Sequence, residues 1–137
     1  MSEGEFRMQE MIFTVGTTYS RKDIQELLDV PEERQNGAWF TGYHFYNNNW
    51  FIFSTIGTAG RTGHDYDDHF EGSDFVWYGK TGSKLSHPSI QSLINPNGFI
   101  HLFVRNNDRK PFTYYGTVKL KAFFNETPVK IIWEIKA

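Results

Sequence analysis

Alternating aromatic and polar positions dominate this chain and predict a mainly β domain. In residues 37–46 aromatic side chains take nearly every second position, and a second apolar run, 50–56, follows three consecutive asparagines (47–49). Because asparagine tolerates positive φ, these segments predict a β-hairpin. Four later runs of the same character predict further strands at 74–79, 99–105, 111–124 and 128–136.

Two short helices are predicted beside these strands. Ser20 is the expected N-cap of the first, with Asp23 at its third position, apolar residues at helical spacing behind it, and Pro31 at its end. Ser86 is the expected cap of the second, with Pro88 in the first turn. The fold class is therefore mainly β (α+β): six to seven mostly antiparallel strands in a barrel or sandwich, with two short helices at the margins.

The length and composition are those of one globular domain. The 137 residues suit a single core over 1–137, in which residues 1–12 form a flexible tail or an edge strand. The chain has no cysteine, which excludes disulfides, thiolate catalysis and Cys-ligated zinc. It contains neither an apolar run of about 20 residues nor a secretion signal. We expect a cytoplasmic protein, or one domain of a longer one.

Charge is divided unevenly along the chain. Residues 1–79 carry 13 acidic and 5 basic side chains, whereas residues 80–137 carry 3 acidic and 9 basic ones. A net charge of −8 followed by +6 suggests a polyanionic partner for the second half. Attraction between the halves, or charges scattered over a solvated surface, would explain the same numbers.

The long polar segment 57–73 holds imidazoles and carboxylates that could bind a divalent metal: His64, Asp65, Asp67, Asp68 and His69. Their spacing matches neither a calcium loop nor a zinc HExxH motif. A solvated loop with local backbone bonds is the favoured interpretation. The glycines of this segment are not followed by the helix that a dinucleotide fingerprint requires.

The sequence supports two catalytic interpretations only weakly. Glu134 and Lys136 have the E-x-K spacing of magnesium-dependent nucleases, with Asp67, Asp68 or Asp74 as the upstream acid, but so short a triplet also suits an exposed strand face. Ser86 and His87 lack the G-x-S-x-G elbow of serine hydrolases. We predict no catalytic residue, no metal and no cofactor. A magnesium-dependent nuclease stays an alternative, as does a peptide- or nucleoside-binding module.

A DNA-binding surface is better supported. Donors suited to phosphates or base edges, together with aromatic and proline surfaces, occur in three polar connections or beside them. The candidates are Arg61, Thr62, His64, Tyr66, Trp77, Lys80, Ser83, Lys84, Ser86, His87, Pro88, Arg105, Arg109 and Lys110. We expect them to converge on one concave patch. Successive strand residues face opposite ways, so either Trp77 or Tyr78 belongs to the core, and the other is expected to point outward.

Five segments resemble the DNA-reading domains of prokaryotic modification-dependent restriction systems, including the sulfur-binding domains of McrA-like HNH endonucleases and their helicase-fused relatives. The segments are YSRKDI, FIFSTIGTAGRTGHDYDDHF, FVWYGKTGSKLSHPSI, HLFVRNNDRKPFTYYG and PVKIIW. The resemblance implies binding of double-stranded, modified DNA and an associated or fused nuclease or helicase. It also implies that His87, Pro88 and Ser89 stand where those domains form a phosphorothioate pocket. A modified cytosine is the other candidate ligand, with Trp77 and Tyr66 as its stacking surfaces.

Overall fold

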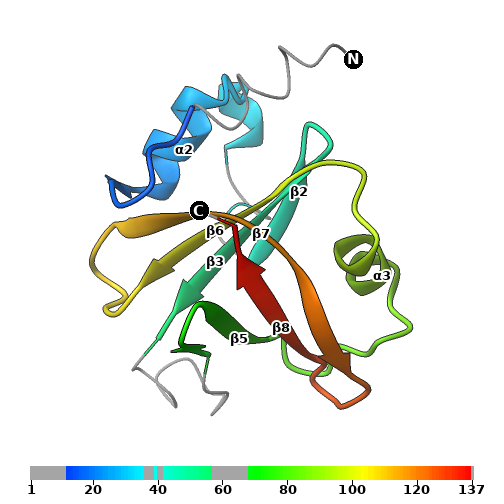
Figure 1. Ribbon diagram of the computed structural model, residues 1–137. Helices are drawn as coiled ribbons and strands as arrows, with labels where there is room; N and C mark the ends of the chain where they lie inside the picture. The colour runs from blue at the N-terminus through cyan, green and yellow to red at the C-terminus, as the bar shows by residue number, and fades with distance from the viewer. Residues whose placement is uncertain (1–11, 36–38, 40–41, 57–67, 137) are drawn as a thin grey trace.

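The computed structural model describes residues 12–35, 39, 42–56 and 68–136. Its described elements are eight strands, two α-helices and one 3₁₀ helix (Figure 1). In chain order they are β1 (Thr18–Tyr19), α2 (Arg21–Leu27), the 3₁₀ helix (Glu32–Arg34), β2 (Tyr43–Tyr46), β3 (Asn49–Thr55), β4 (His69–Glu71), β5 (Asp74–Tyr78), α3 (Pro88–Ile94), β6 (Ile100–Arg105), β7 (Phe112–Phe124) and β8 (Lys130–Ile135).

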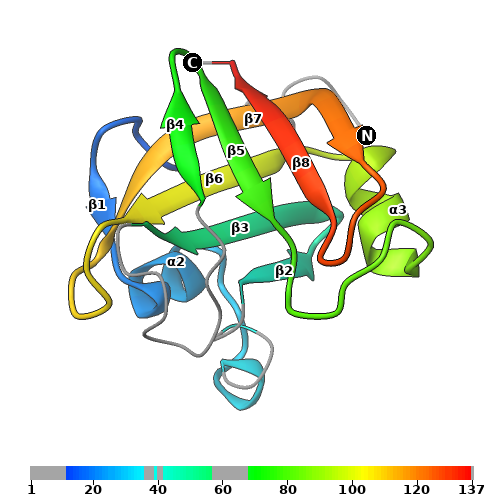
Figure 2. The same cartoon turned by 90° about the horizontal axis from the view of Figure 1, so that it is seen from below.

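The strands form one mixed, strongly curved sheet (Figure 2). Its order is β2-β3-β6-β7-β8-β5-β4, and β1 pairs with the first residues of β7. Among the described residues β2 and β4 end this order unpaired with each other, so the predicted barrel is wrong and an open or sandwich-like sheet takes its place. The β3–β6 pair is parallel, whereas the other described pairs are antiparallel.

Both faces of the sheet are buried over β3 and β6. The inner cluster contains Ile52 and Leu102 with Trp133 of β8 and Leu93 of α3, because the sheet curves around it. The outer cluster contains Phe53, Phe103 and their aromatic neighbours under Ile24 of α2. Burial on two sides explains why the sequences of β3 and β6 are almost continuously apolar.

Local signals place the first helix and the first hairpin as expected. Ser20 and Asp23 form the complete capping box of α2. Asn47 and Asn48 both have positive φ, of 54° and 69°, which matches a two-residue hairpin turn between β2 and β3. The second helix also forms, but its N-cap is His87, which makes no side-chain capping bond, and not the predicted Ser86.

The start of β6 is held against β3 by close backbone contacts. The Asn49 side-chain oxygen accepts a hydrogen bond from Phe99 N–H at 2.8 Å, and Trp50 N–H donates to Phe99 O at 2.9 Å. A Cβ on Gly98 would collide with the backbone oxygen of Asn48, so only glycine permits this approach. The two parallel strands therefore start together and end together, at Thr55 and Arg105.

Asp68 fixes the entry into the short strand β4, which the sequence had placed inside a long loop. Its carboxylate accepts the Ser54 hydroxyl at 2.7 Å and the Tyr78 N–H at 2.9 Å. Because Ser54 is in β3 and Tyr78 ends β5, Asp68 links two strands that are distant in the sheet order.

No helix among the described residues is long and apolar enough to span a membrane.

Candidate nucleic-acid interface

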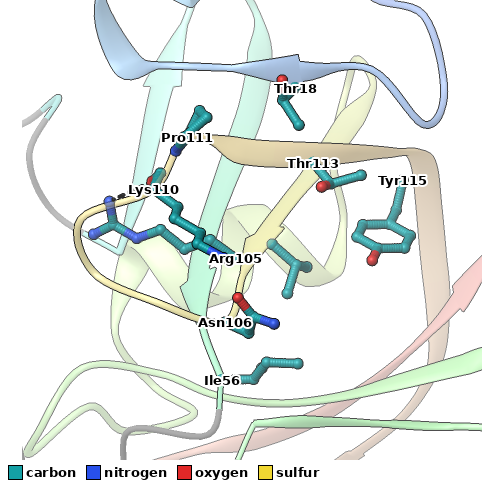
Figure 3. Close-up of a pocket in the computed structure, with 9 residues that line it drawn as sticks. Thr18, Ile56, Arg105, Asn106, Lys110, Pro111, Thr113 and Tyr115 are labelled. Carbon is teal, nitrogen blue, oxygen red and sulfur yellow. Dashed lines mark hydrogen bonds between the residues drawn. The ribbon is translucent and has the colours of Figure 1, made fainter.

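A pocket of about 310 Å³ lies where β6 ends and β7 begins (Figure 3). Nine residues from β1, the end of β3, β6, the β6–β7 connection and β7 line it: Thr18, Ile56, Val104, Arg105, Asn106, Lys110, Pro111, Thr113 and Tyr115. Strand alternation puts Thr113 and Tyr115 on the same side of β7. Pairing of Thr18 with Thr113 brings β1 to the rim.

The connection between β6 and β7 is shaped by its own asparagine. Asn107 accepts the Arg109 N–H on its side-chain oxygen at 2.8 Å and the Lys110 N–H on its carbonyl at 3.1 Å. At the base of the connection, Ile56 N–H donates to Arg105 O at 2.8 Å, which ties the ends of β3 and β6 together. The pocket is therefore built on two rigid strands and a short folded turn.

Four of the polar side chains that line the pocket make no hydrogen bond within the described part of the fold. Asn106, Lys110, Thr113 and Tyr115 make no side-chain hydrogen bond within the part of the chain that the structure describes. Asn106 and Lys110 are exposed, while Thr113 and Tyr115 are half-buried. The Tyr115 ring rests on Phe70 of β4, with ring centroids 4.8 Å apart. These groups offer donors, acceptors and one aromatic surface to a ligand.

The same connection concentrates positive charge. The Arg105 guanidinium lies 4.3 Å from the centroid of the Phe112 ring, and its Nε donates to Thr55 Oγ1 at 2.8 Å. Burial lowers the pKa of Arg105, an effect that the charge of Asp108 opposes. Arg109 and Lys110 are exposed beside it. A cluster of this kind attracts phosphate groups.

The fourteen residues predicted from the sequence fall into three groups. Arg105 and Lys110 line the pocket, and Arg109 is in the same connection. Arg61, Thr62, His64 and Tyr66 lie outside the described residues, as do Asp65 and Asp67 of the suggested metal cluster. The remaining seven precede the body of α3 or lie in the core. Figure 2 shows α3 at the opposite end of the sheet from the β6–β7 connection, so the described candidates do not form the expected single patch.

The group near α3 is largely used by the structure itself. Ser83 is buried and accepts the Val129 N–H on its hydroxyl at 3.3 Å. His87 Nδ1 accepts the Lys84 N–H at 3.2 Å, and the Lys80 ammonium lies 4.6 Å from the Tyr43 ring centroid. Of the other candidates there, Lys84 and Ser86 help to line a second hollow, of about 430 Å³, and Pro88 is exposed in the first turn of α3.

Trp77 is a core residue and offers no stacking surface. It is 2% exposed and packs against Tyr43 and Trp133, with ring centroids at 5.3 and 6.3 Å. Its neighbour Tyr78 is half-buried, with the Lys130 ammonium 6.0 Å from its ring. Trp77 is therefore removed from the candidate stacking residues, and Tyr115 is the aromatic side chain that the pocket contains.

The residues of the nuclease alternative are only partly brought together. Asp74 and Glu134 are direct partners in the β5–β8 pairing. Each carboxylate has a lysine: Lys121 Nζ is 2.5 Å from Asp74, and Lys119 Nζ is 3.4 Å from Glu134. The bond with Asp74 raises the pKa of Lys121. Within the described residues no group of three or more His, Asp or Glu side chains could hold a metal.

Sequence reasoning missed Thr18, Asn106, Thr113 and Tyr115. The segment PFTYYG is part of the family resemblance, but alternating Thr and Tyr also match an ordinary exposed strand face. The position of β1 beside β7 is a tertiary contact, and no local pattern indicates that Thr18 completes a pocket.

The fold of this chain is similar to that of SRA domains of known structure. The SUVH5 SRA domain in complex with hemimethylated CG DNA matches with a TM-score of 0.61 and 14% identity, over 89% of this chain and 87% of that one. The same domain bound to fully hydroxymethylated CG DNA gives a TM-score of 0.56 and 13% identity, over 89% and 93% of the two chains.

A second neighbour is the modification-dependent restriction endonuclease TagI. Its TM-score is 0.55 at 16% identity, and the match covers 90% of this chain but 50% of TagI. Residues 13–136 match the model of a family described as domain of unknown function, DUF3427, and the chain belongs to this family. The comparison with curated proteins finds no relative.

Proposed function

We propose that this domain binds double-stranded DNA and recognises a modified cytosine in it, through the pocket at the β6–β7 connection. The observation that carries the proposal is a set of polar pocket side chains that make no side-chain hydrogen bond within the described residues: Asn106, Lys110, Thr113 and Tyr115. The fold supports it, because SRA domains of the same architecture have been crystallised with methylated and hydroxymethylated DNA.

The pocket suits a base better than a phosphate. Its volume of about 310 Å³ is at the lower end of the range for small-ligand sites. The Asn106 amide can donate to and accept from a base edge, and the Thr113 and Tyr115 hydroxyls can do the same. A base inside a duplex cannot reach such a pocket, so the target nucleotide must rotate out of the stack.

The cations at the rim supply affinity that does not depend on sequence. Arg109 and Lys110 extend from the β6–β7 connection into solvent, where duplex phosphates can approach them. Each neutralised phosphate releases condensed counterions, so binding weakens steeply as salt rises. In this proposal the rim holds the duplex, the pocket selects the base, and an associated or fused nuclease or helicase uses the bound complex.

Phosphorothioate recognition is the competing proposal within the same class. A sulfur-substituted phosphate favours an apolar surface, because sulfur is soft and weakly hydrated. His87 and Pro88 are exposed at the start of α3. This helix is at the other end of the sheet from the β6–β7 connection that borders the pocket (Figure 2). The two proposals therefore predict different ends of the domain as the binding site.

The test is a fluorescence anisotropy panel on one duplex in four forms: unmodified, 5-methylcytosine, 5-hydroxymethylcytosine and phosphorothioate. We expect the wild-type domain to prefer a cytosine-modified form. Thr113→Val should reduce that preference, whereas Thr117→Val, at another half-buried threonine of β7, should leave it unchanged. A 2-aminopurine beside the target base should brighten on binding if the base leaves the stack.

Two results would count against the proposal. Preference for the phosphorothioate duplex, lost in Pro88→Gly and kept in Thr113→Val, would move the site to the α3 end. Equal affinity for all four duplexes in wild type and Thr113→Val would mean that the pocket selects no modification.

A further inference from the structure

The hollow of about 430 Å³ lies at the other end of β7, between the connection that precedes α3 and the β7–β8 connection (Figure 2). Six residues line it: Lys84, Leu85, Ser86, Gln91, Asn125 and Thr127. The exposed side chains of Ser86, Asn125 and Thr127 make no hydrogen bond within the described residues. The hollow therefore offers a ligand donors and acceptors that the described part of the fold leaves unused.

Hydrogen bonds hold both walls of this hollow in place. Val129, the last residue of the β7–β8 connection, donates its N–H to Ser83 O at 3.1 Å and accepts the Gly79 N–H at 3.0 Å. The Gln91 side chain donates to Leu85 O at 2.6 Å, which fixes the entry into α3. Because the walls are already ordered, a ligand that binds there loses little affinity to the ordering of the protein.

Two exposed phenylalanines end β7 beside the hollow. Phe123 is 46% exposed and Phe124 is 40% exposed. Phe123 is paired with Ile131 of the inner cluster, so both side chains point to the face of the sheet that α3 covers. Phe124 points to the opposite face, where the Lys130 ammonium lies 5.1 Å from its ring centroid. Phe123 is thus the ring on the side of the hollow, and Asn125, two positions later, lines that hollow.

The charge around the hollow is positive. Residues 79–98 contain two lysines and no acidic side chain. Glu126 is the one carboxylate of the β7–β8 connection, and Lys130 follows it. Lys84 and Lys130 form no ion pair within the described residues. Three lysines against one carboxylate favour an anionic partner at this end of the sheet.

We propose that this hollow and the Phe123 ring bind single-stranded DNA, with a phosphate at Lys84 and an unpaired base stacked on Phe123. An exposed ring beside a lysine suits a nucleotide, because the base has an aromatic face and the phosphate a negative charge. In a duplex each base is already stacked between its neighbours, so the ring selects an unpaired strand. An acidic protein segment would use the lysines and leave the ring without a role. The choice of DNA rests on the proposed function, whereas the site rests on the geometry around the hollow.

Anisotropy titrations with a labelled oligo(dT) strand test the stacked base first. We expect Phe123→Ala to weaken binding by about 5- to 100-fold, which corresponds to the loss of one stacked base. The matched control is Phe124→Ala, at a neighbouring ring of similar exposure on the opposite face, and it should leave the affinity unchanged. Equal losses in the two variants would overturn the site.

Salt dependence tests the phosphate contact with a variant that keeps every aromatic ring. Lys84→Gln should reduce the magnitude of the slope of log K against log salt by about 0.7, the value for one phosphate of a single strand. Lys130→Gln, on the Phe124 face, should leave the slope unchanged. Circular dichroism melting checks that each variant is folded, and the Lys84→Gln slope decides if Phe123→Ala is not.

Variants at the two ends separate this site from the pocket. Thr113→Val should leave oligo(dT) affinity unchanged, and Phe123→Ala should leave the preference among modified duplexes unchanged. If the wild type binds no duplex but holds oligo(dT) through Phe123, the proposed function fails and this site stands. Equal oligo(dT) affinity in wild type, Phe123→Ala and Lys84→Gln would overturn the site and leave the duplex proposal standing. Displacement of oligo(dT) by polyglutamate at equal charge concentration would also overturn it, because an acidic protein would then fit as well.

Discussion

The two ends of the long strand β7 carry similar side chains but use them differently. At the end near α3, Ser83, His87 and Gln91 form hydrogen bonds within the fold, to Val129, Lys84 and Leu85. At the pocket end, the side chains of Asn106 and Thr113 form none within the described residues. Figure 2 shows α3 and the β6–β7 connection at opposite ends of the sheet. Polar residues thus point to function only where the structure leaves them unused.

The largest effect should come from disturbing β6, the strand that runs beside β7 from the α3 end to the pocket. His101 of β6 is fully buried, stacks on Phe51 and contacts Tyr114 OH through Nδ1 at 2.8 Å. Its Nε2 has no hydrogen-bond partner in the described part of the chain. Burial lowers the pKa of His101 to about 4, so the imidazole is neutral in the folded protein at pH 7.

The pKa of His101 is lower in the folded protein than in the unfolded chain, and this determines the sign of the pH dependence of stability. The histidine of the unfolded chain takes up a proton near pH 6.5, whereas folded His101 stays neutral down to about pH 4. Between these two values the unfolded chain binds more protons, so the free energy of unfolding falls as the pH is lowered from 6.5 to 4. At about 1.4 kcal/mol per pH unit, the free energy of unfolding should drop by about 3 kcal/mol over this interval. Urea unfolding should show that His101→Phe lacks this component, and identical pH profiles of the two proteins would contradict the prediction.

Which parts of the structure the sequence predicts depends on how far apart along the chain the interacting residues lie. The capping box of Ser20 and Asp23 and the turn at Asn47 and Asn48 are local, and both form as predicted. The parallel β3–β6 pair requires contacts between residues 50 positions apart, which alternation does not encode. The sequence predicts Arg105 as a candidate because a basic side chain in a polar connection can be recognised from the sequence. Tyr115 and Thr18 line the pocket only because of the strands that pack beside them.

Removing one positive charge at each end of the sheet should show which end contributes to duplex affinity. Arg105→Gln should weaken duplex binding by about 1–3 kcal/mol, because in the proposed complex this half-buried arginine at the pocket contacts a base or an enclosed phosphate. Lys84→Gln removes an exposed charge near α3 and should cost less than about 0.5 kcal/mol. Anisotropy titrations at one salt concentration measure both. A larger loss in Lys84→Gln would place the duplex at the α3 end.

A pair of polar truncations tests whether one end stabilises the fold and the other binds the ligand. Ser83→Ala removes the 3.3 Å hydroxyl acceptor of the buried Val129 N–H, which keeps its 3.1 Å bond to Ser83 O. It should therefore lower the free energy of unfolding by only about 0.5 kcal/mol and leave DNA affinity unchanged. Asn106→Ala should do the reverse and reduce the preference for modified DNA. The predicted difference between the two ends is contradicted if both variants lose folding stability and DNA affinity to the same extent.

The smallest effect is expected midway along β7, which belongs to neither end. Glu134 and Lys119 form an exposed pair at 3.4 Å, and such pairs contribute about 0–1 kcal/mol. Glu134→Gln should therefore change neither folding nor duplex affinity beyond that range. The same variant tests the nuclease alternative, which requires Glu134 as a magnesium ligand. Magnesium-dependent cleavage by the wild-type domain that disappears in Glu134→Gln would make this middle region the functional one. Because Lys119 and Lys121 already neutralise Glu134 and Asp74, we expect no difference between the two proteins in that assay.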